Sequence, residues 1–444
     1  MSKKVFLKGT LILACTGLVS RIAGFFYRIF LSHAIGAEGL GLYQLILPLQ
    51  GLMAALSYTG IQSALSRLIA SRLALQEKKE AYFSLVTGIF AAVFFSAVTG
   101  FLLFRHADFF ASTILKAPGT SDLLRLTAAS IPLCAIHSCI DSYYYARKKA
   151  SVPAAVQLSE QAVRIGATYI LYLIFLSEGR PVTAMIAAGG SLAGEAAASL
   201  ISLLMVSFHF GNHPVKEKTS VKIFPLIKDL FTLSFPISLN RILLTLLGSI
   251  EAVLIPQMLI RCGMTSSEAL KIYGIFTGMA LPLLLFPSTL TTSAAVMLMP
   301  SVARMDALGD QKQIRHVTDQ TFFLCIFLGF LCGSGFFLFG PFLGTLLFHS
   351  KTAGTYIRYL SFICPFLYTN TMLASILQGL GRPGRCLIHS AAGILIRIFS
   401  VVFMIPAIGI RGYFYGIFLG ELLLSLLHVK ALKFSYRQAG DNRL

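Results

Sequence analysis

Twelve apolar stretches, each long enough to cross a lipid bilayer as a helix, constrain this chain more than any other feature. A spanning helix needs about 20 mainly apolar residues. The window from Ala81 to Phe104 and the run from Thr321 to Phe348 carry no charged residue. The predicted segments are 8–32, 40–61, 82–104, 123–146, 154–176, 182–208, 227–259, 272–296, 318–340, 354–378, 386–406 and 412–434.

Composition agrees with this pattern. Hydrophobic residues make up 56% of the chain, charged residues 12%, and the mean hydropathy is +0.77. Soluble domains carry about 25% charged residues. The sequence therefore predicts an all-α polytopic membrane protein with about twelve transmembrane helices.

Basic residues give the expected orientation. The chain has 37 Lys and Arg against 18 Asp and Glu. With the N-terminus inside, most of this excess falls on cytoplasmic loops, as the positive-inside rule requires. We therefore expect a multi-pass protein of the cell membrane with both termini in the cytoplasm. The positive charge does not indicate a nucleic-acid partner.

The sequence repeats itself once. Residues of the first half recur in order about 230 residues later: Tyr43 as Tyr273, Ser63 as Ser293, Arg164 as Arg397 and Glu195 as Glu421. Six helices per copy give both copies the same orientation in the membrane, so the repeat is parallel. We expect two pseudosymmetric six-helix lobes, residues 1–210 and 227–444, joined by a basic cytoplasmic linker at 211–226. Two such lobes around a midplane cavity are typical of a transporter.

Five arginines lie inside the apolar segments. A buried cation costs about 2.5–3.5 kcal/mol on insertion scales, so its presence indicates a use. We expect these side chains to line a central cavity and bind an anionic group of the substrate. They are Arg21, Arg28, Arg164, Arg241 and Arg397.

Some of these arginines have a second interpretation. Arg28 lies near the outer end of the first segment and could reach the membrane surface, while Arg241 could mark the cytoplasmic boundary of its segment. Arg164 can form an ion pair with Glu160, four residues before it. Arg397 has Gly393 at that place, so it is predicted to be the less compensated cation.

Acidic residues in the segments supply counter-ions or a coupling site. Glu195 and Glu421 are repeat-related, and each follows a glycine that allows close helix contact. They either join helices within each lobe or bind a coupling proton or cation. Glu251, in the middle of the seventh segment, is the natural counter-ion for the cavity arginines.

Motifs for catalysis are absent from the sequence. It contains no H-E-x-x-H, no Walker A motif and no nucleophile elbow. The nine histidines lack metal-ligand spacing, and the eight cysteines form no C-x-x-C motif. We expect no enzyme activity, no metal and no cofactor. Transport would then be driven by an ion gradient, the membrane potential or the lipid gradient.

Two N-terminal segments carry a family resemblance. SRIAGFFYRI at 20–29 and IGAEGLGLYQ at 35–44 resemble the start of the stage V sporulation protein B group. That group belongs to the multidrug/oligosaccharidyl-lipid/polysaccharide (MOP) exporter superfamily, with the MurJ lipid II flippases and the MATE drug exporters as relatives. The resemblance implies two lobes in a V around a cationic cavity lined by the first-helix arginines, which Arg21 and Arg28 match.

The resemblance also implies a substrate. Alternating access would move an undecaprenyl-pyrophosphate-linked saccharide from the inner to the outer leaflet. Many members have fourteen helices, the last two forming a groove for the lipid tail. This chain offers twelve segments, so we expect that groove to be missing or built differently.

We therefore expect a flippase for a lipid II-like precursor of peptidoglycan or spore cortex. Its partners would be the lipid-linked pyrophosphate saccharide, membrane lipids and the cell-wall synthesis machinery, and it would act as a monomer. Two alternatives stay open. One is a MATE-like exporter of organic cations driven by sodium or protons, and the other is a membrane scaffold for cell-wall or spore assembly.

Overall fold

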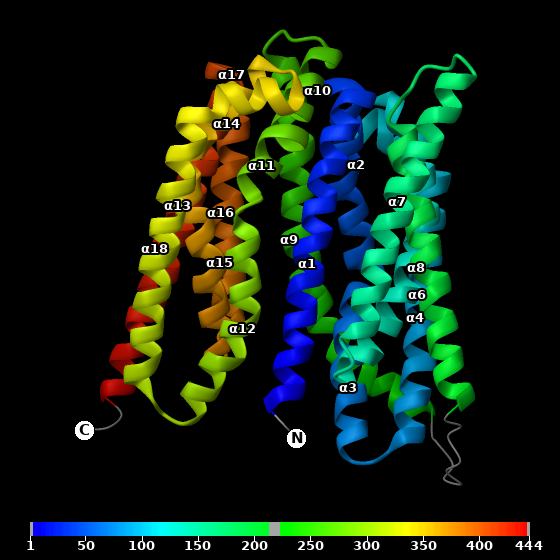
Figure 1. Ribbon diagram of the computed structural model, residues 1–444, viewed down its shortest axis with the longest axis vertical. Helices are drawn as coiled ribbons and strands as arrows, with labels where there is room; N and C mark the ends of the chain where they lie inside the picture. Colours follow the sequence, from blue (N-terminus) through cyan, green and yellow to red (C-terminus); the bar gives the residue numbers. More distant parts are fainter. Residues whose placement is uncertain (1–2, 213–222, 442–444) are drawn as a thin grey trace. The chain divides into compact units, whose positions relative to one another are not determined.

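The computed structural model describes residues 3–212 and 223–441, and these form helices joined by short turns, with no strand among them (Figure 1). The all-α prediction is confirmed. Residues 213–222 of the predicted linker lie outside the described residues. The helices of the first half are α1 (Lys3–Ala34), α2 (Gly36–Ser57), α3 (Thr59–Ala74), α4 (Lys78–Arg105), α5 (Ala107–Phe109), η1 (Phe110–Ile114), η2 (Pro118–Thr120), α6 (Ser121–Ala146), α7 (Ser151–Ser177) and α8 (Met185–Asn212).

The second half continues in the same manner. Its helices are α9 (Ile223–Arg261), α10 (Ser266–Gly274), η3 (Ile275–Ala280), α11 (Leu281–Leu285), α12 (Ser288–Ala307), α13 (Gln311–Phe348), α14 (Lys351–Leu360), η4 (Ser361–Ile363), α15 (Cys364–Gly379), α16 (Pro383–Phe403), α17 (Ile405–Ile408) and α18 (Ile410–Asp441).

Ten spans within the described residues are long and apolar enough to cross a membrane. They correspond to ten of the twelve predicted segments. The other two segments form α1, with 32 residues, and α7, with 27 residues. At 1.5 Å per residue, even α7 is about 40 Å long, which exceeds the roughly 30 Å hydrocarbon core. These are the helices that carry Arg21, Arg28, Glu160 and Arg164.

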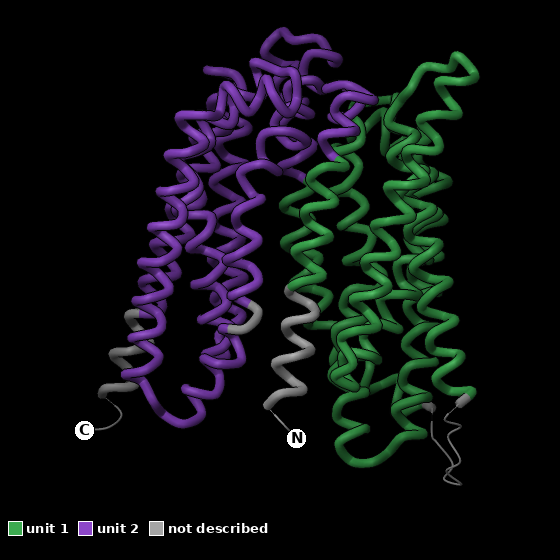
Figure 2. The backbone as a smooth tube through the Cα atoms, in the orientation of Figure 1, with its two compact units in different colours: residues 1–27, 42–249 green, residues 28–41, 250–444 purple. Residues whose placement is uncertain are grey.

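The chain folds into two compact units (Figure 2). Unit 1 comprises residues 1–27 and 42–249, and unit 2 comprises 28–41 and 250–444. These bounds differ from the predicted lobes, 1–210 and 227–444, because the first part of α9 packs with unit 1 and residues 28–41 pack with unit 2. The lobes themselves stay a prediction.

Two helix breaks follow the internal repeat. In unit 1 the break between α2 and α3 falls at Tyr58, and in unit 2 the break between α11 and α12 falls at Phe286 and Pro287. A shift of 230 residues, the spacing from Tyr43 to Tyr273, brings the two breaks together. The backbone therefore repeats along with the sequence.

Residues 36–41, at the start of α2, pack tightly on α10. A Cβ atom at Gly41 would overlap the carbonyl oxygen of Leu270, and one at Gly274 would overlap that of Ala37. The hydroxyl of Ser267 donates a hydrogen bond to the Glu38 carboxylate at 2.6 Å. Glycine is needed here because two helix backbones touch.

Glycines also set the spacing of the helices that carry buried charge. In unit 1, a Cβ at Gly194 of α8 would lie 3.0 Å from the carbonyl oxygen of Glu160 on α7. In unit 2, a Cβ at Gly420 of α18 would lie 3.0 Å from the carbonyl oxygen of Gly393 on α16. The predicted close helix contact is confirmed in both copies, and it brings the glutamate after each glycine to the neighbouring helix.

Candidate functional site: two buried ion clusters

The unit 1 cluster consists of Arg164, Glu160, Glu195 and His137. Arg164 and Glu160 form an ion pair along α7. Glu195 of α8 lies 3.6 Å from the same guanidinium group and 2.9 Å from Nε2 of His137 on α6. The exposed fractions of the Arg164 and Glu195 side chains are 23% and 12%. The cluster therefore joins three helices through one guanidinium, one imidazole and two carboxylates.

The unit 2 cluster consists of Arg397, Glu251, Glu421, Tyr413 and Asn370. Nε and Nη2 of Arg397 on α16 donate to the two carboxylate oxygens of Glu251 on α9, at 2.7 and 3.1 Å. This bidentate geometry is the strong form of the pair. The Tyr413 hydroxyl also donates to Glu251, at 2.7 Å. Glu421 of α18 lies 3.4 Å from Arg397 and accepts a 2.8 Å hydrogen bond from the Asn370 amide.

The interpretation of Arg397 as the less compensated cation is wrong. Glu251 and Glu421 both contact Arg397. The missing carboxylate at Gly393 is replaced by one on α9, 146 residues away in sequence. Spacing along a single helix could not reveal this partner.

The remaining three predicted arginines lie outside these clusters. Arg21 on α1 and Arg241 on α9 are exposed in unit 1, whereas Arg28 is half-buried and belongs to unit 2. The prediction that five arginines face one central cavity thus stays a prediction.

Helix α1 is fixed against α7 near Arg164. The amide of Gln161 donates to the carbonyl oxygen of Ser20 at 3.2 Å, and the hydroxyls of Tyr27 and Thr168 lie 3.0 Å apart. Arg164 donates to the other end of the Gln161 amide at 3.1 Å. The backbone next to Arg21 is therefore connected to the unit 1 cluster.

Arg21 and Glu251 occupy repeat-related positions. The shift of 230 residues that relates Tyr43 to Tyr273 also relates position 21 to position 251. In unit 2 this place holds the carboxylate that closes the cluster. In unit 1 it holds an exposed guanidinium, and Glu160 on α7 supplies the carboxylate instead.

His137, Asn370 and Tyr413 were missed by sequence reasoning. One available signal was the repeat, because His137 and Asn370 are separated by the same 233 residues as Arg164 and Arg397. Each of them binds the repeat-related glutamate of its own unit. The contact of Tyr413 with Glu251 follows from no spacing rule.

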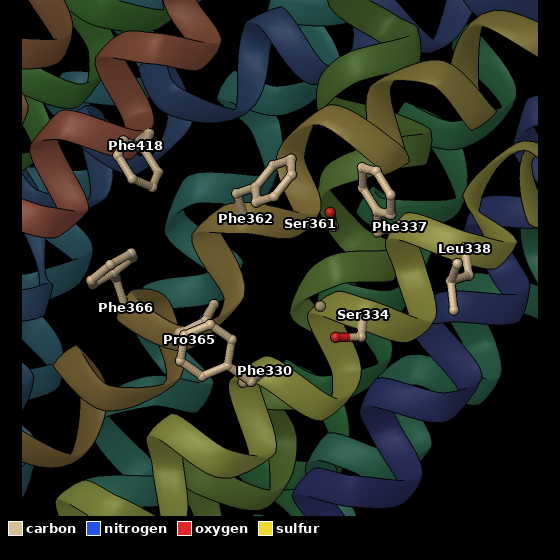
Figure 3. Close-up of a pocket in the computed structure, with 11 residues that line it drawn as sticks. Phe330, Ser334, Phe337, Leu338, Ser361, Phe362, Pro365, Phe366 and Phe418 are labelled. Atoms are coloured by element: carbon tan, nitrogen blue, oxygen red, sulfur yellow. The ribbon is translucent and has the colours of Figure 1, made fainter.

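Unit 2 also contains an apolar pocket of about 540 Å³ (Figure 3). Its wall is formed by α13, η4, α15 and α18, and its polar side chains are Ser334 and Ser361. The rings of Phe366 and Phe418 meet edge to face with centroids 5.5 Å apart. Five phenylalanines line it: Phe330, Phe337, Phe362, Phe366 and Phe418. The size falls in the range of roughly 300–1,000 Å³ found for ligand pockets.

Comparisons with known proteins agree with this architecture. A family model described as polysaccharide biosynthesis protein matches residues 6–306. Stage V sporulation protein B of Bacillus subtilis is 30% identical over 440 residues, covering 96% of this chain and 83% of the relative. Lipid II flippase MurJ of the same organism is 22% identical over 457 residues, covering 96% and 82%.

Solved structures share the fold. An inward-facing multidrug resistance MATE family transporter of the MOP superfamily has a TM-score of 0.70 and 16% identity, covering 96% of this chain and 99% of that one. A MOP superfamily transporter from Pyrococcus furiosus, described by the reverse polarity of its binding pocket, has a TM-score of 0.68 and 16% identity over 99% of both chains. The predicted MATE-like fold is thus confirmed.

Proposed function

Because this multi-pass membrane chain belongs to the polysaccharide biosynthesis protein family, we propose that it is a flippase for a polyprenyl-pyrophosphate-linked saccharide. The names of two relatives support the substrate class, since one is a sporulation protein and the other a lipid II flippase. The saccharide would be a precursor of peptidoglycan or spore cortex. It would move from the inner to the outer leaflet of the cytoplasmic membrane, with both termini of the protein in the cytoplasm.

The observation that carries this proposal is Arg21. It is an exposed guanidinium in a 32-residue helix, at the position where unit 2 holds the buried Glu251. A cation that closes no cluster in its own unit is suited to an anion that comes from outside. The planar guanidinium matches the oxygens of a pyrophosphate, which it can bind in a bidentate manner.

The five arginines then divide into two roles. Arg21, Arg28 and Arg241 would contact the pyrophosphate during transport. Arg164 and Arg397 would act as positioning residues, because each already contacts two carboxylates. The four glutamates of the clusters would be the counter-ions that keep these helices together.

The apolar pocket of unit 2 suits the other end of such a substrate. Its wall is almost entirely hydrocarbon and aromatic, so a polar saccharide would lose its hydrogen bonds there. A stretch of polyprenyl chain would not. This assigns head and tail to chemically different parts of the protein.

Replacing Arg21 tests the proposal. In liposomes, Arg21→Ala is expected to reduce flipping of a labelled polyprenyl-pyrophosphate saccharide by about 10- to 100-fold, the effect of losing a charged hydrogen bond of about 1.5–3 kcal/mol. Arg21→Lys should recover part of the activity, because it keeps the charge without the planar fork. The amount of folded protein should not change.

Arg67→Ala is the matched control, since Arg67 is an exposed arginine on α3 of the same unit. It should flip at the wild-type rate. Full activity of Arg21→Ala would remove Arg21 from the site. Loss of folded protein with normal transport per folded molecule would make its role structural.

One observation favours a second candidate, an exporter of organic cations. Each ion cluster contains two carboxylates and one guanidinium, and carboxylates suit a cationic substrate. The same liposomes separate the candidates: an exporter would move a fluorescent organic cation down a sodium or proton gradient and leave the lipid-linked saccharide in place.

A further inference from the structure

We propose that unit 1 contains a binding site for a zinc-like transition-metal ion, formed by Cys134, His137 and Glu195. One ligand atom of each residue, the Cys134 sulfur, a His137 ring nitrogen and a Glu195 carboxylate oxygen, lies within 4.8 Å of the others. This site is independent of the transport proposed above. It concerns which ion the unit 1 cluster holds, not which substrate crosses the membrane.

The helix geometry places these ligands together. Cys134 and His137 lie three residues apart on α6, so they project from the same face. Glu195 reaches them from α8, which Gly194 allows to approach closely. Thiolate, imidazole and carboxylate are the three ligand types of zinc, and three protein ligands leave its fourth position open.

A second carboxylate supports the histidine. Nε2 of His137 faces Glu195 at 2.9 Å, and Nδ1 faces Asp141 at 3.8 Å. Among the described residues, Nδ1 of His137 and Oδ1 of Asp141 have no hydrogen-bond partner. A metal-bound histidine commonly directs its other nitrogen at a carboxylate, which fixes the ring. A short movement of Asp141 would complete that pair.

The charges around the site are unbalanced without a cation. Glu160, Glu195 and Asp141 are each less than one-fifth exposed. They share one guanidinium, that of Arg164, and one imidazole. Buried carboxylates in excess of their partners are costly. A divalent ion bound by Glu195 and Cys134 would offset this excess from the side opposite Arg164.

Unit 2 shows that the fold does not need these ligands. The shift of 233 residues relates Cys134, His137 and Asp141 to Leu367, Asn370 and Ala374. There the Asn370 amide binds Glu421 directly, and no thiol or extra carboxylate is present at these positions. Three side chains with metal-binding or supporting chemistry therefore occur together in one copy and are all absent from the other.

Cobalt and zinc binding test this site on the full-length protein in detergent or nanodiscs. Metal content after incubation with Zn²⁺ and gel filtration should approach one ion per chain. Co²⁺ should give the charge-transfer absorption of a cobalt–thiolate bond. Cys134→Ser should abolish this band, and His137→Asn should lower the zinc content well below one ion per chain.

Cys139→Ser is the matched control, because Cys139 is a buried cysteine on the same helix that is not part of the three-ligand group. It should bind metal as the wild type does. If Cys134→Ser fails to fold, the cobalt band of the wild type and of Cys139→Ser still decides the matter. A wild-type protein that retains no zinc and gives no thiolate band overturns the proposal. So does unchanged binding by Cys134→Ser. Flipping activity need not change in either case, so failure here is distinct from failure of the proposed transport.

Discussion

The two units hold their buried arginines through different partners on a repeated backbone. In unit 1, Arg164 pairs with Glu160 on its own helix. In unit 2, Arg397 pairs with Glu251, which arrives from α9. The glutamate after the glycine, Glu195 or Glu421, is common to both. The difference teaches that the first helix of each repeat sets the balance: it contributes a carboxylate in unit 2 and the exposed Arg21 in unit 1.

The largest expected effect comes from removing the unit 2 arginine. Arg397→Ala leaves Glu251 and Glu421 buried without their cation, which should cost about 3–5 kcal/mol of stability. Arg164→Ala should cost less, because His137 still contacts Glu195 and can carry a proton. Thermal unfolding of the two purified variants in the same detergent gives the comparison. Glu251→Gln should restore part of the loss in Arg397→Ala, and equal losses in the two single variants would contradict the distinction.

A smaller effect is expected from the hydroxyl that only unit 2 supplies. Tyr413→Phe removes a hydrogen bond to the buried carboxylate of Glu251 and should cost about 1.5–3 kcal/mol, the range for hydrogen bonds to charged groups. Tyr415→Phe is the control, because Tyr415 lies on the same helix and is 56% exposed. If both variants unfold at the wild-type temperature, Tyr413 does not help to close the unit 2 cluster.

The smallest effect is expected from making unit 1 resemble unit 2. In metal-free buffer, His137→Asn should change stability by only about 1 kcal/mol, because a side-chain amide can donate to Glu195 as Asn370 does to Glu421. The unfolding midpoint measures this directly. A collapse of the folded protein would show that the two clusters are not interchangeable even at their repeat-related positions.

Much of the fold follows from the sequence, because a membrane leaves few options. Backbone groups in hydrocarbon must be bonded within a segment, so apolar length alone predicts helices. The repeat of Tyr43 and Arg164 indicated two copies, and the structure repeats the helix breaks as well. The bounds of the compact units did not follow, since residues 28–41 pack with helices made much later in the chain.

The site was harder to predict than the fold. The pair of Glu160 with Arg164 lies on one helix, and its spacing is enough to predict it. The pairs of Arg397 with Glu251 and of His137 with Glu195 join different helices. Such contacts depend on how helices are rotated against one another, which the periodicity of one helix does not contain. The internal repeat carried part of this information, through His137 and Asn370.

The close packing of residues 36–41 on α10 has a consequence for how the protein is made. Glu38 and its partner Ser267 are 229 residues apart in the chain. At roughly 5–20 residues per second, the ribosome needs about 11–46 s to supply that partner. During this interval the glycine-rich turn is already at the membrane with no helix to pack against. Biogenesis therefore has an unavoidable waiting period, and in it a nascent chain that has already inserted several helices still presents an unfinished surface to the insertion machinery.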